Sequence, residues 1–156
     1  MEVNYRIDLG IGESEAARYS ATEIESLTRH LREPLSLGGD RQRVFDELYD
    51  VGEECSVEGW DGYQGKAIST DAYRRAYLLI EALPSGIPLP SVVPEPDGKI
   101  ALEWYHSPRR VLSISTSRGC DLHYTALVGP NSSCGTEAFF GELPDAILDM
   151  LRRVMR

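Results

Sequence analysis

The strongest constraint on the fold is a run of apolar residues at every second position between residues 100 and 128. Three segments carry this alternation, with turn-forming residues between them. The apolar members are Ile100, Leu102, Trp104, Leu112, Ile114, Leu122, Tyr124, Ala126 and Val128. The positions between them are mostly polar, among them Glu103, Ser113 and His123. Because successive side chains of a strand point to opposite faces, the pattern predicts an antiparallel sheet covered on one side only.

Turn and capping signals predict helices on both sides of these strands in the sequence. Ser69 is placed to cap a helix whose buried stripe comprises Tyr73, Ala76, Tyr77, Ile80 and Leu83. Asp40 is placed to cap an earlier helix with Val44, Phe45, Leu48, Val51 and Cys55 on its apolar face. Leu143-Pro144 opens a C-terminal helix with Ile147, Leu148, Leu151 and Val154 directed inward.

Three further elements complete the expected order. Residues 3–9 alternate as a strand does, and a capping box at residues 20–23 begins a short helix that ends at Pro34. A proline-rich connection over residues 84–96 leads to Asp97-Gly98, which is typical of a hairpin tip. A last strand is expected at residues 137–140.

These elements define a single α+β domain over residues 1–156. We expect an antiparallel sheet of three to five strands, helices packed on one of its faces, and a C-terminal helix. Residues 1–55 form an acidic part with a strand and helices, and residues 56–156 form a part with a helix and the sheet. The chain has 42% hydrophobic residues, and neither a signal peptide nor a membrane-spanning run is recognisable in it.

Charge is distributed unevenly along the chain. The net charge is −9; residues 1–61 hold 15 acidic and 6 basic side chains, and residues 62–156 hold 10 of each. A protein that relies on phosphate contacts needs clustered Lys and Arg, so this distribution disfavours direct nucleic-acid binding. It favours a basic protein partner. The alternative is that the excess negative charge only keeps the protein soluble.

The acidic residues of the second predicted helix lie opposite its apolar face. They are Asp46, Glu47, Asp50, Glu53 and Glu54. Five carboxylates so close together repel one another and lower the stability of the helix. We therefore take this acidic face as the candidate binding site for a partner.

The residues that could support catalysis or bind a metal do not form a recognised motif. Cys120 and His123 lie three residues apart, and His106 precedes them, so a cysteine nucleophile with a histidine base is the enzymatic alternative. Because successive side chains of a strand alternate between its faces, an interval of three residues places Cys120 and His123 on opposite faces. Zinc-binding spacing is absent, and we expect neither a metal nor a cofactor. Cys55, Cys120 and Cys134 are an odd set without paired spacing, which indicates the reducing cytoplasm.

The Trp60-Asp61-Gly62 turn has a structural interpretation. In such turns the aspartate accepts hydrogen bonds from nearby backbone amides while the tryptophan packs under the loop. Trp104, at the end of the predicted Ile100–Trp104 strand, is expected to be buried under a helix. These four residues belong to one pattern along the sequence.

That pattern runs through Trp60-Asp61-Gly62, Ile68-Ser69, Pro88-Leu89-Pro90, Asp97-Gly98 and Leu102-Glu103-Trp104. It resembles a group of small uncharacterised bacterial and phage proteins with a W-D-G…I-S…P-x-P-x-G-x-I-x-L-E-W signature, over roughly residues 56–128. The resemblance implies an architecture and no activity. Residues 1–50, with most of the acidic helix, lie outside it.

The sequence therefore predicts a non-enzymatic, acidic, cytoplasmic protein that blocks a basic partner such as a nuclease or a nucleic-acid-handling complex. Antitoxins, immunity proteins and phage anti-defence proteins, including anti-CRISPR proteins, are of this kind. Two alternatives stay open. One is an enzyme that uses Cys120, His123 and His106. The other is an assembly component that forms a homodimer or larger homo-oligomer through an uncovered sheet edge.

Overall fold

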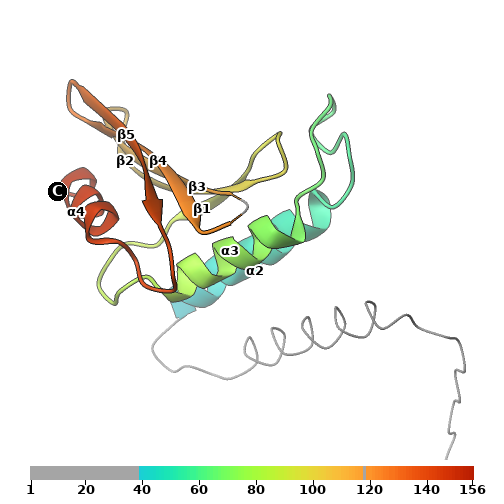
Figure 1. Cartoon of the computed structure of the whole chain (residues 1–156), viewed down its shortest axis with the longest axis horizontal. Helices are drawn as coiled ribbons and strands as arrows, with labels where there is room; N and C mark the ends of the chain where they lie inside the picture. Colours follow the sequence, from blue (N-terminus) through green and yellow to red (C-terminus); the bar gives the residue numbers. More distant parts are fainter. Residues whose placement is uncertain (1–38, 118) are drawn as a thin grey trace, which may run out of the picture. The chain divides into compact units, whose positions relative to one another are not determined.

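A computed structural model describes residues 39–117 and 119–156 (Figure 1). The elements follow in the order α2 (Gly39–Glu54), α3 (Thr70–Glu81), β1 (Ser91–Pro94), β2 (Ile100–Ser107), β3 (Arg110–Thr116), β4 (Asp121–Val128), β5 (Asn131–Ala138) and α4 (Asp145–Val154). The strand predicted at 3–9 and the helix predicted from 20 to 33 lie outside the described residues. No helix within the described ranges is both long enough and apolar enough to cross a membrane.

The five strands form one sheet in the order β1-β2-β3-β4-β5. Every neighbouring pair is antiparallel, so each strand is joined to the next by a hairpin. The prediction of an α+β fold with a C-terminal helix is confirmed. Strand β1 lies within the proline-rich connection, and it pairs Val92 with Leu102.

One face of the sheet carries the core. Its fully buried side chains include Ile100, Leu102, Trp104, Leu112, Ile114, Leu122 and Ala126, so the predicted strand faces are correct. Helix α3 packs on this face, where the Thr116 hydroxyl donates to the Ala72 carbonyl at 3.4 Å and to the Ile100 carbonyl at 2.8 Å. Figure 1 shows α2 and α3 side by side beneath the strands. Helix α4 covers the same face beside β2, β3 and β4.

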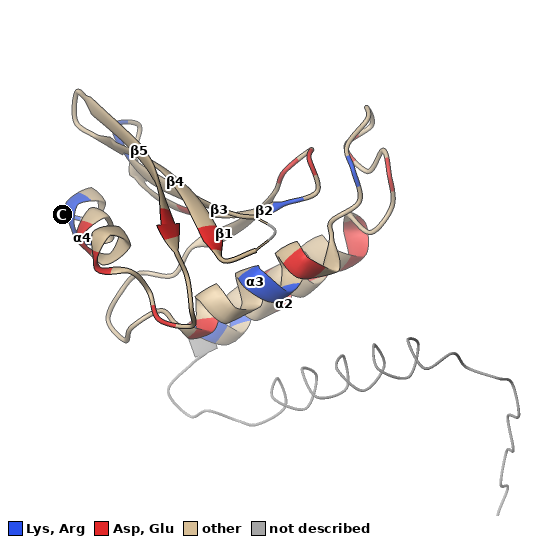
Figure 2. Cartoon of the chain, viewed as in Figure 1, with Lys and Arg blue, Asp and Glu red and all other residues tan. Residues whose placement is uncertain are grey.

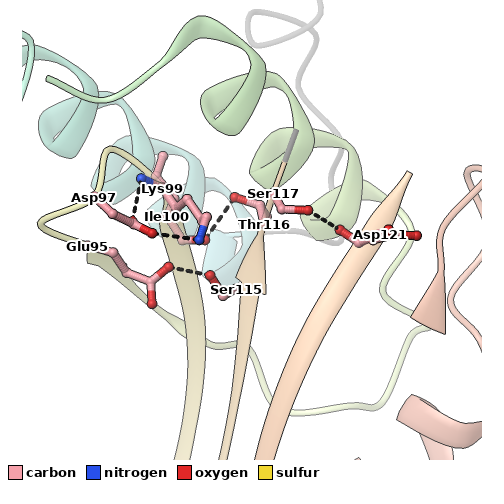
Figure 3. Close-up of polar contacts among 8 residues, drawn as sticks. All are labelled: Glu95, Asp97, Lys99, Ile100, Ser115, Thr116, Ser117 and Asp121. Atoms are coloured by element: carbon pink, nitrogen blue, oxygen red, sulfur yellow. Dashed lines mark hydrogen bonds and ion pairs between the residues drawn. The ribbon is translucent and has the colours of Figure 1, made fainter. Parts of the chain in front are cut away.

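The tip of the β1–β2 hairpin holds the start of α3 in place. Ser69 caps α3 as predicted, its hydroxyl accepting from the Ala72 amide at 3.1 Å. The Ser69 amide donates to the Gly98 carbonyl at 3.1 Å, and the Lys66 amide donates to Pro96 at 2.8 Å. Figure 3 shows how the tip is closed, by the Asp97–Lys99 ion pair at 2.6 Å and by the Ser115 hydroxyl donating to Glu95.

Two predicted boundaries and one predicted set of buried residues are wrong in detail. Helix α2 already includes Gly39, so Asp40 lies in its first turn and does not cap it. Strand β5 spans Asn131–Ala138, and not residues 137–140, because its sequence is too polar to show an apolar alternation. In α4 Met150 is buried and Leu148 is only half-buried. Residues at the edge of the apolar face of a helix can differ in burial in this way while the helix itself stays as predicted.

Candidate protein-binding surface

The outward side of α2 carries most of the predicted acidic residues. Val44, Leu48 and Cys55 are buried against the rest of the domain. At about 100° per residue, the positions 46, 50 and 53 lie on the opposite side of the helix, and position 54 lies at the flank of that side. Asp46, Asp50, Glu53 and Glu54 are all exposed. Four of the five predicted carboxylates therefore share one accessible surface.

Glu47 has a different role from the one its sequence position suggested. It lies next to Leu48, at the flank of the buried side, and it is only partly exposed. Its Oε1 atom accepts a hydrogen bond from the Val92 amide of β1 at 3.0 Å. Glu47 thus joins α2 to the edge of the sheet, and it is not part of the exposed face.

An aromatic residue that the sequence analysis missed lies among these carboxylates. Tyr49 is 54% exposed, three positions after Asp46 and four before Glu53. Residues three and four apart are neighbours on a helix surface, so the tyrosine lies beside Asp46 and Glu53, at the margin of the set nearest Tyr73 of α3. We call Asp46, Tyr49, Asp50, Glu53 and Glu54 the acidic stripe. The i, i+3, i+4, i+7 spacing from Asp46 is the signal that could have revealed Tyr49.

The carboxylates of the acidic stripe have no cationic partner among the described residues. The ion pairs within that part of the chain are Lys99–Asp97 and Arg152–Asp149, both remote from α2 in sequence. Asp46 accepts only a neutral hydrogen bond, from the Gln42 side-chain amide at 2.9 Å. Figure 2 shows acidic colour at the C-terminal end of α2.

The position of Glu53 and Glu54 is itself unfavourable for the helix. They occupy the last turn of α2, which contains no basic residue. The C-terminal end of a helix carries partial negative charge, so an anion there destabilises by about 0.3–1 kcal/mol when exposed. Packing of the buried side has to offset this cost.

Hydrogen bonds within residues 60–66 hold the Trp60-Asp61-Gly62 turn, and those to Asp61 are of the predicted kind. Asp61 Oδ1 accepts from the amides of Tyr63 at 2.9 Å and Gly65 at 3.0 Å. The Trp60 indole donates to the Lys66 carbonyl at 2.9 Å. The Asp61 Oδ1 atom and the Trp60 indole thus close the loop, and Tyr63 is exposed at its tip.

The hydrogen bonds to Asp61 give the turn a dependence on pH. The two amide donors hold the pKa of the Asp61 carboxyl below its ordinary value of 3.8. A lowered folded-state pKa means that the carboxylate stabilises the fold at pH values above the ordinary one, and that this contribution is lost as the pH falls through the lowered pKa. We expect the difference in unfolding free energy between wild type and Asp61→Asn to be constant above about pH 5 and to shrink below pH 4. Denaturant titrations across pH measure it, and a difference that is equal at all pH values would contradict the assignment.

The residues of the enzymatic alternative are used in separate contacts. His123 lies on the open face of the sheet, where its Nδ1 atom is 2.9 Å from the Thr136 hydroxyl. The Cys120 sulfur accepts from the Arg75 guanidinium at 3.7 Å. Among the described residues no hydrogen bond joins Cys120, His123 and His106. Nor does that part of the chain bring together three or more His, Cys, Asp or Glu residues in a metal-binding group.

An arginine at the start of β3 contacts the end of α4. The Arg110 guanidinium, at the start of β3, donates to the Arg153 carbonyl at 2.9 Å. Arg152 forms its ion pair with Asp149 at 3.0 Å. Cations at a helix C-terminus interact favourably with its partial negative charge. These arginines therefore stabilise α4 and its contact with the β2–β3 hairpin.

Comparison of the chain with protein-family models, with curated proteins and with solved structures finds no match. The resemblance to the W-D-G…L-E-W group therefore stays a prediction.

Proposed function

We propose that this protein is a non-enzymatic binding protein that engages a basic protein through the acidic stripe. The observation that carries the proposal is the exposure of Asp46, Asp50, Glu53 and Glu54 on one helix side without a cationic partner among the described residues. An antitoxin, an immunity protein or a phage anti-defence protein would use such a surface against a nuclease or a nucleic-acid-handling complex. Its place of action would be the cytoplasm, which agrees with the three free cysteines.

The chemistry of the stripe fits a surface that normally binds nucleic acid. A row of carboxylates presents acceptor oxygens and negative charge to Lys and Arg, as a phosphate backbone does. Complementary charge raises the rate of association and disfavours partners of the wrong sign. The domain would then occupy the partner's active or binding surface and exclude its substrate.

Tyr49 supplies an aromatic ring for packing, which the carboxylates lack. Interfaces draw most of their binding energy from a few central residues, and tyrosine and arginine are enriched among them. An exposed tyrosine ring bordered by Asp46 and Glu53 can pack against an arginine side chain while the carboxylates pair with its guanidinium. We therefore expect Tyr49 to add an aromatic contact at the margin of the interface, beside the carboxylates.

Neutralising the stripe tests the proposal. The variant combines Asp46→Asn, Asp50→Asn, Glu53→Gln and Glu54→Gln, and the partner is one identified by mass spectrometry after co-purification with the full chain at low salt. We expect affinity to fall by about tenfold or more, mainly through slower association, and wild-type affinity to decline as salt rises. Surface plasmon resonance over a salt series measures both rates.

The control variant removes the same number of charges elsewhere, at the exposed residues Glu81, Asp121, Glu142 and Asp145. It should bind as the wild type does. If both variants bind equally, the charge serves solubility alone. In that case the stripe variant would only melt at a slightly higher temperature, because like-charge repulsion along α2 is relieved.

A further inference from the structure

The two edges of the sheet are protected to very different degrees. Edge strand β1 has only four residues, and it ends at Pro94. The outward-facing amide of Val92 is occupied by the Glu47 carboxylate. Short length, proline and covering groups are the means by which proteins prevent an edge from pairing with another chain. Strand β1 uses all three.

Strand β5, at the other edge, has none of these protections within the part of the chain that the structure describes. It has eight residues, contains no proline, and pairs with β4 at eight successive positions without a bulge. Glu137 is its only charged residue. Within residues 39–117 and 119–156, no strand lies on its outer side. A long, regular edge with a single charged residue is a template for a further strand.

The pairing pattern identifies the backbone groups that face outward. The Phe139 amide donates to the Cys120 carbonyl at 2.7 Å, and this pair continues the β4–β5 register. Hydrogen-bonded and non-hydrogen-bonded pairs alternate along an antiparallel ladder. The odd-numbered residues of β5 therefore bond to β4. The amides and carbonyls of Ser132, Cys134, Thr136 and Ala138 point away from the sheet.

We propose that β5 pairs antiparallel with β5 of a second copy of this chain about a two-fold axis at Gly135, which joins the two sheets into one. This register pairs Cys134 with Thr136 of the second copy and Ser132 with Ala138 of the second copy. Every outward amide and carbonyl of the strand is then used. Glu137 lies opposite Ser133 of the second copy, so no like charges face each other across the junction.

The environment of Gly135 fits a position on the axis. The ring of Tyr124, its partner on β4, lies directly over it: a Cβ atom at Gly135 would lie 2.7 Å from the tyrosine oxygen. In the dimer the Tyr124 rings of the two copies approach each other over the junction and cover it on the helix side. A second copy is favoured over an unrelated strand because the edge is complementary to itself in length, charge and pairing pattern.

Mass and hydrogen exchange of the full chain test the dimer. We expect light scattering to give twice the mass of one chain, falling toward one chain on dilution. In the dimer the amides of Ser132, Cys134, Thr136 and Ala138 exchange as slowly as those of Ser133, Gly135 and Glu137. A monomer at every concentration, or rapid exchange confined to the even-numbered amides, would overturn the proposal.

A proline variant with a matched control separates backbone pairing from side-chain effects. Cys134→Pro removes one outward amide and leaves the β4 ladder intact, since proline is tolerated where the amide faces outward on an edge strand. It should raise the dimer dissociation constant roughly tenfold or more, because each copy loses a hydrogen bond. Cys134→Ser should dimerise as the wild type does. An unchanged dimer in the proline variant would refute this interface.

Thr136→Lys provides a second variant that does not depend on proline. It should also dissociate the dimer while the circular dichroism spectrum stays unchanged.

The dimer interface shares no residue with the acidic stripe. The stripe variant should therefore keep the dimer mass, and the two proposals can fail independently.

Discussion

Replacing Trp104 by alanine should lower the free energy of unfolding by about 3–5 kcal/mol, the largest effect we expect from a single side chain. Trp104 is 1% exposed, and it pairs with Leu112 on the face that the helices cover. Its removal would leave a large cavity that rigid neighbours fill only in part. The indole also donates to the Pro88 carbonyl at 2.7 Å, so the variant would lose the anchor of the connection before β1. Denaturant titration followed by circular dichroism measures the loss.

Two control variants separate the contributions. Trp104→Phe keeps an aromatic ring in the core and leaves the Pro88 carbonyl without its donor, so it should cost about 1–3 kcal/mol. Tyr105→Ala removes a neighbouring aromatic residue that is 61% exposed on the open face, and it should change stability by less than about 0.5 kcal/mol. A larger loss for Tyr105→Ala than for Trp104→Ala would mean that the faces of β2 are reversed, and equal losses would contradict the burial of Trp104 alone.

The parts of the fold that could be predicted are those that depend on neighbours in the sequence. The alternation from Ile100 to Ala126 placed the core face correctly, because strand periodicity is a property of the chain itself. The Ser69 cap was equally local. Strand β5 was placed wrongly because its residues are polar or small and mostly exposed, which leaves no alternation to recognise.

The candidate site was predictable only in part, for the same reason. Helical spacing alone selected Asp46, Asp50, Glu53 and Glu54, and these are exposed. Glu47 has the same residue type and a similar spacing, yet its carboxylate binds Val92 from a strand 45 residues later. Tertiary contacts of this kind have no signature in the local sequence. They also decide which sheet edge is covered, which is why the contrast between β1 and β5 emerges only from the structure.

The second large effect is expected at Gly98. Its φ angle is +88°, in a region that L-residues with a side chain rarely occupy, and it lies at the turn between β1 and β2. A Cβ atom there would also lie 2.8 Å from the carbonyl oxygen of Ala67. Positive φ alone costs roughly 1–2 kcal/mol for a residue with a Cβ atom. Because the oxygen belongs to the backbone, it cannot move aside as a flexible side chain would, and we expect Gly98→Ala to cost about 3 kcal/mol in total.

Gly86→Ala is a closely matched control for that prediction. Gly86 has almost the same φ angle, +87°, and a Cβ atom there would meet nothing within 4 Å. The difference between the two variants in unfolding free energy therefore measures the contacts of the added Cβ atom with Lys66 and Ala67. Since the Gly98 carbonyl accepts from the Ser69 amide, displacement of the hairpin should also loosen the start of α3. Faster hydrogen exchange of the Ser69 amide in Gly98→Ala, but not in Gly86→Ala, would demonstrate this coupling. Equal stability of the two variants would show that the hairpin tip does not pack against residues 66–69.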